Sequence, residues 1–175
     1  TSRLIEADTA RINTAGELRM YSQQLAKAVL SLGHELRASQ PTQTSLAQVS
    51  ESHAAFVDSL RRLGDGLEKA AQEEFAPKEI GEAREKLDDL TKTWEPLGRE
   101  AAMLLAIPNL TPEDVTSAAS QVFNRNVKLM QQAGDLTAIL EGSAIKRSSS
   151  MRQIQLVAIV LAFLNFIFIV FKFLR

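Results

Sequence analysis

The feature that most restricts what this chain can fold into is an uncharged stretch of eighteen residues near its C-terminal end. Residues 154–171 read IQLVAIVLAFLNFIFIVF, with Arg152 before them and Lys172 and Arg175 after them. A helix of that length is about 27 Å long and nearly crosses the ~30 Å hydrocarbon core of a bilayer. A signal peptide would lie at the N-terminus, so the stretch is predicted to be a transmembrane helix with the lipid bilayer as partner.

The charge pattern of the remaining residues excludes one class of partner. The chain has a formal net charge of −1, with acidic and basic residues interspersed. Since nucleic-acid-binding proteins present a basic stripe, no nucleic-acid partner is expected. The chain also has no cysteine, which excludes disulfides and thiolate metal sites and fits an oxidising compartment as well as a reducing one.

Four helical patterns precede and enter the apolar stretch. The first runs from about residue 3 to residue 38 and is expected to stop before Pro41. The second covers about 44–74, and the third starts after the turn at residues 75–77. The fourth starts with a capping signal at Thr111 followed by Pro112. Its apolar residues repeat at intervals of seven, which predicts packing along another helix: Val115, Val122, Leu129 and Leu136.

Long helices joined by short turns pack as antiparallel neighbours. We therefore predict an all-α fold, an antiparallel up-down four-helix bundle continuing into a C-terminal transmembrane helix. Residues 1–146 form the bundle, and residues 147–175 form the juxtamembrane segment and the transmembrane helix. Both ends of the bundle then lie at the membrane, so a first transmembrane helix is expected before Thr1.

The first helix carries two stripes. One is apolar and is assigned to the core: Leu18, Leu25, Val29, Leu32 and Leu36. The other lies about 100–140° away around the helix and contains a charge: Ile5, Ile12, Gly16, Arg19 and Gln23. A glycine in mid-helix costs ~1 kcal/mol against alanine, so Gly16 suggests that another backbone approaches there. The second stripe is predicted to be a dimer seam.

The same segment carries a sequence pattern of the form I-N-x-A-G-x-x-R-M-x-S. Its matching residues are Ile12, Asn13, Ala15, Gly16, Arg19, Met20 and Ser22. The pattern resembles the ligand-sensing segment of the nitrate/nitrite sensor histidine kinases (NarX type) and of the PilJ-type N-terminal domain of type IV pilus chemotaxis receptors. The four helices, Trp94 in the third and a fourth helix entering a transmembrane segment are similar to both.

This resemblance implies a homodimer in which the Arg19 side chains of the two protomers hold one small anion. The ligand-binding residues it implies are Arg19, Asn13, Gly16, Ser22 and Gln23. Two guanidiniums ~5 Å apart repel by ~3 kcal/mol at an effective dielectric constant near 20, and an anion between them would reverse the sign. Nitrate sensors tend to carry a second arginine where this chain has Gln24, so the resemblance leaves the ligand open.

Purely structural roles are the alternative for several of these residues. Arg19 could be a solvated helix arginine paired with Glu17 or another acid, and Trp94 is expected in the core. His34 and His53 have no partner at metal-ligand spacing, so neither a metal nor a cofactor is predicted. No nucleophile with a base and no phosphate-binding loop is recognisable, so this part of the protein is not expected to be an enzyme.

Together these observations predict a ligand-sensing and transmembrane signalling module of a bacterial receptor in the inner membrane, with residues 1–146 periplasmic. The resemblance alone supplies this orientation, because cations lie on both sides of the span. An output domain would follow Arg175. Two alternatives remain: a pilus-linked chemoreceptor domain with a protein ligand, and a tail-anchored helical adapter that ends at Arg175.

Overall fold

A computed structural model describes residues 2–72 and 78–174, with side chains for residues 4–72, 78–149 and 152–167. It contains four helices, whose bounds are α1 Ser2–Arg37, α2 Gln43–Ala71, α3 Lys78–Ala106 and α4 Pro112–Leu174. These ranges confirm the predicted all-α fold. The predicted turn at residues 75–77 lies outside the described residues.

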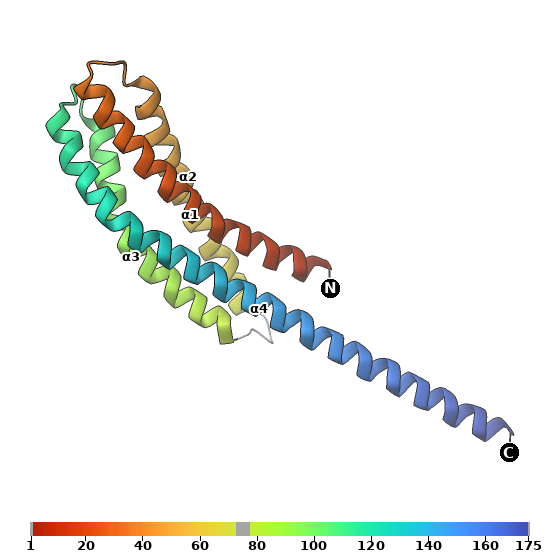
Figure 1. Cartoon of the computed structure of the whole chain (residues 1–175). Helices are drawn as coiled ribbons and strands as arrows, with labels where there is room; N and C mark the ends of the chain where they lie inside the picture. The colour runs from red at the N-terminus through yellow and green to blue at the C-terminus, as the bar shows by residue number, and fades with distance from the viewer. Residues whose placement is uncertain (1, 73–77, 175) are drawn as a thin grey trace.

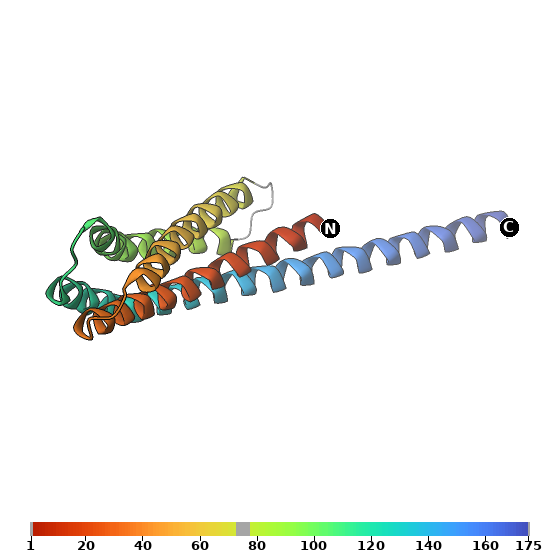
Figure 2. The same cartoon turned by 90° about the horizontal axis from the view of Figure 1, so that it is seen from above.

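The helices form an antiparallel up-down bundle. Within the described residues, α1 packs on α2 and α4, and α3 packs on the same two helices, so the chain closes into a four-membered ring. Figures 1 and 2 show α1 and α4 side by side along the length of α1, with α4 extending far beyond it. The beginning of α1 therefore lies next to the part of α4 that leads into the apolar stretch.

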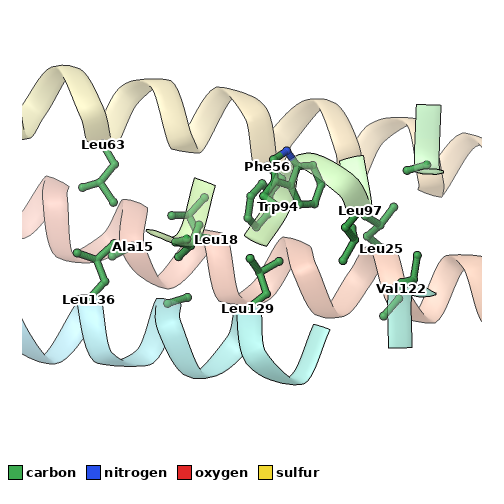
Figure 3. Close-up of a cluster of buried hydrophobic side chains, with 14 of the residues drawn as sticks. Ala15, Leu18, Leu25, Phe56, Leu63, Trp94, Leu97, Val122, Leu129 and Leu136 are labelled. Carbon is green, nitrogen blue, oxygen red and sulfur yellow. The ribbon is translucent and has the colours of Figure 1, made fainter. Parts of the chain in front are cut away.

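The core forms where the apolar stripes of all four helices meet. The repeat of seven on α4 is buried as predicted, with Leu129 and Leu136 fully excluded from solvent. Trp94 is 5% exposed and stacks on Phe56 with ring centroids 3.8 Å apart, which confirms its core position. Figure 3 shows these side chains converging from the four helices. Burial of this many Leu, Val, Phe and Trp side chains supplies the main stabilisation of the bundle.

The end of α1 has a local cause that the sequence analysis did not identify. Ser39 adopts a positive φ of 54°, the backbone conformation that often ends a helix. The Gln40 N–H then reaches back to the Glu35 carbonyl at 2.8 Å. Together with the bond from the Ser39 N–H to the Leu36 carbonyl at 3.2 Å, this bond satisfies carbonyls at the helix end before the chain reaches Pro41.

The start of α4 is capped as predicted. The Thr111 Oγ accepts a hydrogen bond from the Asp114 N–H at 3.3 Å, and the Asp114 carboxylate accepts from the Thr111 N–H at 3.0 Å. From there α4 continues for 63 residues. Among the described residues it is the helix long and apolar enough to cross a membrane, since an 18-residue window has mean hydropathy 1.6 and none of it is buried.

The cap predicts a pH-dependent contribution to stability. The Thr111 hydroxyl, followed by its N–H, lowers the pKa of Asp114 below the ordinary aspartate value. Because the pKa is lower in the folded state, this stabilisation is complete above the unfolded pKa and is lost as the pH falls through the folded pKa. Thr111→Ala should raise the Asp114 pKa in an NMR titration and lower the melting temperature at neutral pH by roughly 2–4 °C.

Thr116→Ala is the matched control for this prediction. Thr116 lies one turn later on the same helix, and its hydroxyl donates only to the Pro112 carbonyl at 2.7 Å. An unchanged Asp114 titration in Thr111→Ala would contradict the assigned cap.

Candidate functional site

The candidate ligand residues lie on two different sides of α1. Asn13, Gly16, Arg19 and Gln23 are exposed, whereas Ser22 is 2% exposed. The Gln23 Nε2 donates to the Met130 Sδ of α4 at 3.5 Å, and Gly16 and Arg19 lie within about 40° of Gln23 around the helix, on the flank of α1 that borders α4. Asn13 lies about 80° from Gln23, on the solvent side of this flank. We call this surface the α1–α4 face.

Ser22 is not on this face. Its hydroxyl donates to the backbone carbonyl of Arg19 at 2.8 Å and faces the bundle interior. Ser22 is three residues after Arg19, which turns its side chain about 60° around the helix toward the core stripe. The Ser22 hydroxyl therefore bonds to the backbone of Arg19. It does not reach the α1–α4 face.

The acid nearest to Arg19 in sequence is engaged elsewhere. Glu17 accepts hydrogen bonds from Ser59 at 3.0 Å and from Arg62, both on α2. The Glu17 carboxylate raises the pKa of Arg62 above its ordinary value, because its hydrogen bond favours the charged guanidinium. Side chains two residues apart face opposite sides of a helix, which explains why Glu17 meets α2 instead of Arg19.

Arg19 itself reaches into solvent. Among the residues that the structure describes, no acidic side chain lies within salt-bridge distance of it. An exposed guanidinium keeps its charge and its five donors available for an oxyanion. Arg19 is exposed to solvent in this chain and does not pair with Glu17, and its role in binding a ligand stays a prediction.

The surface beside Arg19 has room for a close neighbour. A Cβ built on Gly16 would meet nothing within 4 Å, and the same is true of Gly134 on α4. Gly134 follows Met130 by one turn and Arg19 precedes Gln23 by one turn, so the antiparallel register places Arg19 level with Gly134. No backbone of the described residues approaches Gly16, and the approach of a second copy stays a prediction.

The α4 side of this face was missed by the sequence analysis. Phe123 and Val127 are 59% and 61% exposed, and Ile5 on α1 is 55% exposed. A signal was present in the sequence, because Phe123, Val127, Met130 and Gly134 repeat at four, three and four beside the buried repeat of seven. Large apolar side chains are thus exposed on both helices of this face.

The two histidines lie on different helices, α1 and α2. His34 is exposed near the end of α1, and the His53 ring lies 5.6 Å from the Trp94 ring. In the described part of the chain, no group of three or more metal-ligating side chains is brought together.

Two arginines on α1 allow the exposed and buried environments to be compared. Arg11 is 7% exposed, pairs with Asp8 and donates to the Gly66 carbonyl of α2 at 3.3 Å. Arg11→Ala should lower the free energy of unfolding by about 2 kcal/mol, because it removes the hydrogen bond to Gly66 and the nearest counter-ion of the mostly buried Asp8. Asp8 keeps Arg147 at 3.5 Å. Arg19→Ala should change it by less than about 0.5 kcal/mol. Urea denaturation in detergent measures both, and equal losses would contradict this assignment.

The comparisons with known proteins agree with this architecture. A family model described as the type IV pili methyl-accepting chemotaxis transducer N-terminal domain (PilJ) matches residues 1–122. The match covers the first three helices and the beginning of α4, including every candidate ligand residue. No curated protein and no solved structure matches the chain. The chain therefore belongs to the PilJ family of type IV pili methyl-accepting chemotaxis transducer N-terminal domains, and its bundle is a sensory module.

Proposed function

We propose that this module senses a small anion, similar to nitrate or nitrite, at a symmetric seam between two copies of the chain. Arg19 of each copy donates to the anion, with Asn13 and Gln23 at the edge of the site. The observation that carries the proposal is the state of Arg19, which is exposed and lacks an acidic partner within the described chain, while Glu17 is held by Arg62. A guanidinium suits a planar oxyanion because its donors form paired hydrogen bonds.

The composition of the α1–α4 face supports a second copy as its partner. Exposed Ile5, Phe123 and Val127 would be covered by a symmetric contact, and exposed apolar clusters are typical of interaction surfaces. The open space at Gly16 and Gly134 permits two helix pairs to approach closely. Without an anion, the two Arg19 charges would oppose this approach.

Signalling follows from the same arrangement. Anion binding would favour one spacing of the paired α1 helices, and a ligand shifts an equilibrium only through such a difference in affinity. Because α4 packs along α1 and continues without a break through residue 174, a small slide or rotation would pass into the membrane. In this proposal residues 1–146 are periplasmic, and an output domain such as a histidine kinase follows Arg175.

Calorimetric titration of the chain in detergent tests the anion site. Wild type should bind nitrate or nitrite at about one anion per two chains, and Arg19→Ala should abolish the heat. Arg125→Ala is the control, since Arg125 is an exposed arginine of α4 on the flank where Gln121 meets Glu100 of α3. No heat with nitrate, nitrite or small carboxylates would overturn the anion proposal and leave the dimer to be judged separately.

Disulfide cross-linking tests the seam independently of the ligand. The chain has no cysteine, so Gly16→Cys introduces a single thiol, for which the helix surface has space. We expect rapid formation of a covalent dimer in membranes under mild oxidation. Gly81→Cys is the control, because Gly81 is an exposed helical glycine of α3 with equally open surroundings. Equal cross-linking of both variants would contradict the seam.

A protein ligand is the second candidate, and one observation favours it. At the pole farthest from the span, Met103 and Leu105 are 59% and 37% exposed close to the turn between α3 and α4. A pilin-like protein could dock on these turns. In that case Arg19→Ala would spare signalling, whereas polar substitutions of Met103 and Leu105 would abolish it. Membership of a transducer family favours either receptor over a tail-anchored adapter.

A further inference from the structure

A cavity of about 210 Å³ lies between the beginning of α1 and the segment of α4 that precedes the apolar stretch. One part of its lining is apolar, from Leu4 and Ile5 of α1. The other part is polar and carries charge: Asp8, Arg147, Ser148 and Arg152. The cavity therefore joins an apolar wall to a cluster of hydrogen-bond donors.

The polar part of the lining has an excess of positive charge. Asp8 accepts a hydrogen bond from Arg11 and lies 3.5 Å from the Nη1 of Arg147. Its single negative charge is thus shared by guanidiniums from both helices, and Arg152 adds a further positive charge at the rim. Arg147 is only 12% exposed, so its charge acts where water screens little.

The position of the cavity along α4 points to the type of ligand. Arg152 precedes the uncharged residues 154–171 by two positions, and Gln155, within that stretch, also lines the cavity. If α4 crosses a bilayer, this level corresponds to the lipid phosphates. Basic pockets beside membrane helices are suited to lipid head groups, and arginine donates paired hydrogen bonds to phosphate.

We propose that this cavity binds the head-group phosphate of an anionic membrane lipid. Arg147, Arg152 and the Ser148 hydroxyl donate to the phosphate oxygens, while Leu4 and Ile5 contact the carbon atoms of the head group. A free phosphate ion would leave this apolar wall unused, which favours the lipid. Because Leu4 and Ile5 belong to α1 and the phosphate donors to α4, the bound lipid stabilises the register of the two helices where they reach the membrane.

This inference is independent of the anion site proposed at Arg19, which lies three turns further along α1. Ile5 also belongs to the stripe proposed to meet a second copy. The two arginines and Ser148, not Ile5, therefore carry the specificity for the head group.

Native mass spectrometry of the chain released from detergent tests the proposal. With phosphatidylglycerol added, wild type should retain bound lipid, and phosphatidylcholine should be retained about tenfold less. Arg152→Gln should weaken phosphatidylglycerol binding about tenfold, the loss expected for one charged hydrogen-bonding partner. Arg147→Gln should do the same, and the exposed position of Arg152 separates this effect from a failure to fold.

Lys146→Gln is the matched control. It removes one positive charge next to Arg147, but the Lys146 ammonium pairs with Glu79 of α3 and does not line the cavity. Equal lipid retention by Arg152→Gln and Lys146→Gln, or equal retention of the two lipids, would overturn the proposal. Displacement of the lipid by inorganic phosphate at a similar concentration would also overturn it and indicate a site for a free anion.

Discussion

The packing of α1 against α4 is the contact on which the rest of this structure depends. The repeat of seven on α4 is buried from Val115 at the far pole to Leu136, which is level with the middle of α1, and α1 and α4 stay in contact along the bundle. Near the far pole they approach so closely that a Cβ on Gly33 would lie 3.3 Å from Val115. Because α4 is also the helix that continues into the apolar stretch, α1 is packed directly on the helix that forms the candidate membrane span.

Different sides of α1 face different surroundings. Its apolar stripe supplies core residues such as Leu18 and Leu25, and the side toward α2 carries Glu17, which binds Ser59 and Arg62. The side toward α4 leaves Arg19 in solvent. Consecutive residues turn by about 100°, so a helix can pair an acid with a neighbouring helix and leave an arginine two positions later without an acidic partner among the described residues. The availability of Arg19 follows from this geometry and from the partners that α2 offers to Glu17.

Much of the fold was predictable because it depends on short-range patterns. Leucines at helical spacing identified the core stripe, and Thr111 identified the start of α4, since capping involves residues only three positions apart. Other features were not predictable from spacing alone. Ser22 belongs to the same motif as Arg19 but is buried, and the contribution of Phe123 to the exposed face was overlooked because the neighbouring repeat of seven dominated the pattern.

By itself, the sequence determined four helices, their buried stripes and the long apolar continuation of α4, because these follow from periodicity, hydrogen bonding and length within one helix. Only the tertiary structure decided which side chains from distant parts of the chain meet. The contact of Asp8 with Arg147 and that of Gln23 with Met130 join residues more than a hundred positions apart. Such contacts depend on the register and rotation of two antiparallel helices, which are set by the packing of all four and are not encoded in either helix alone.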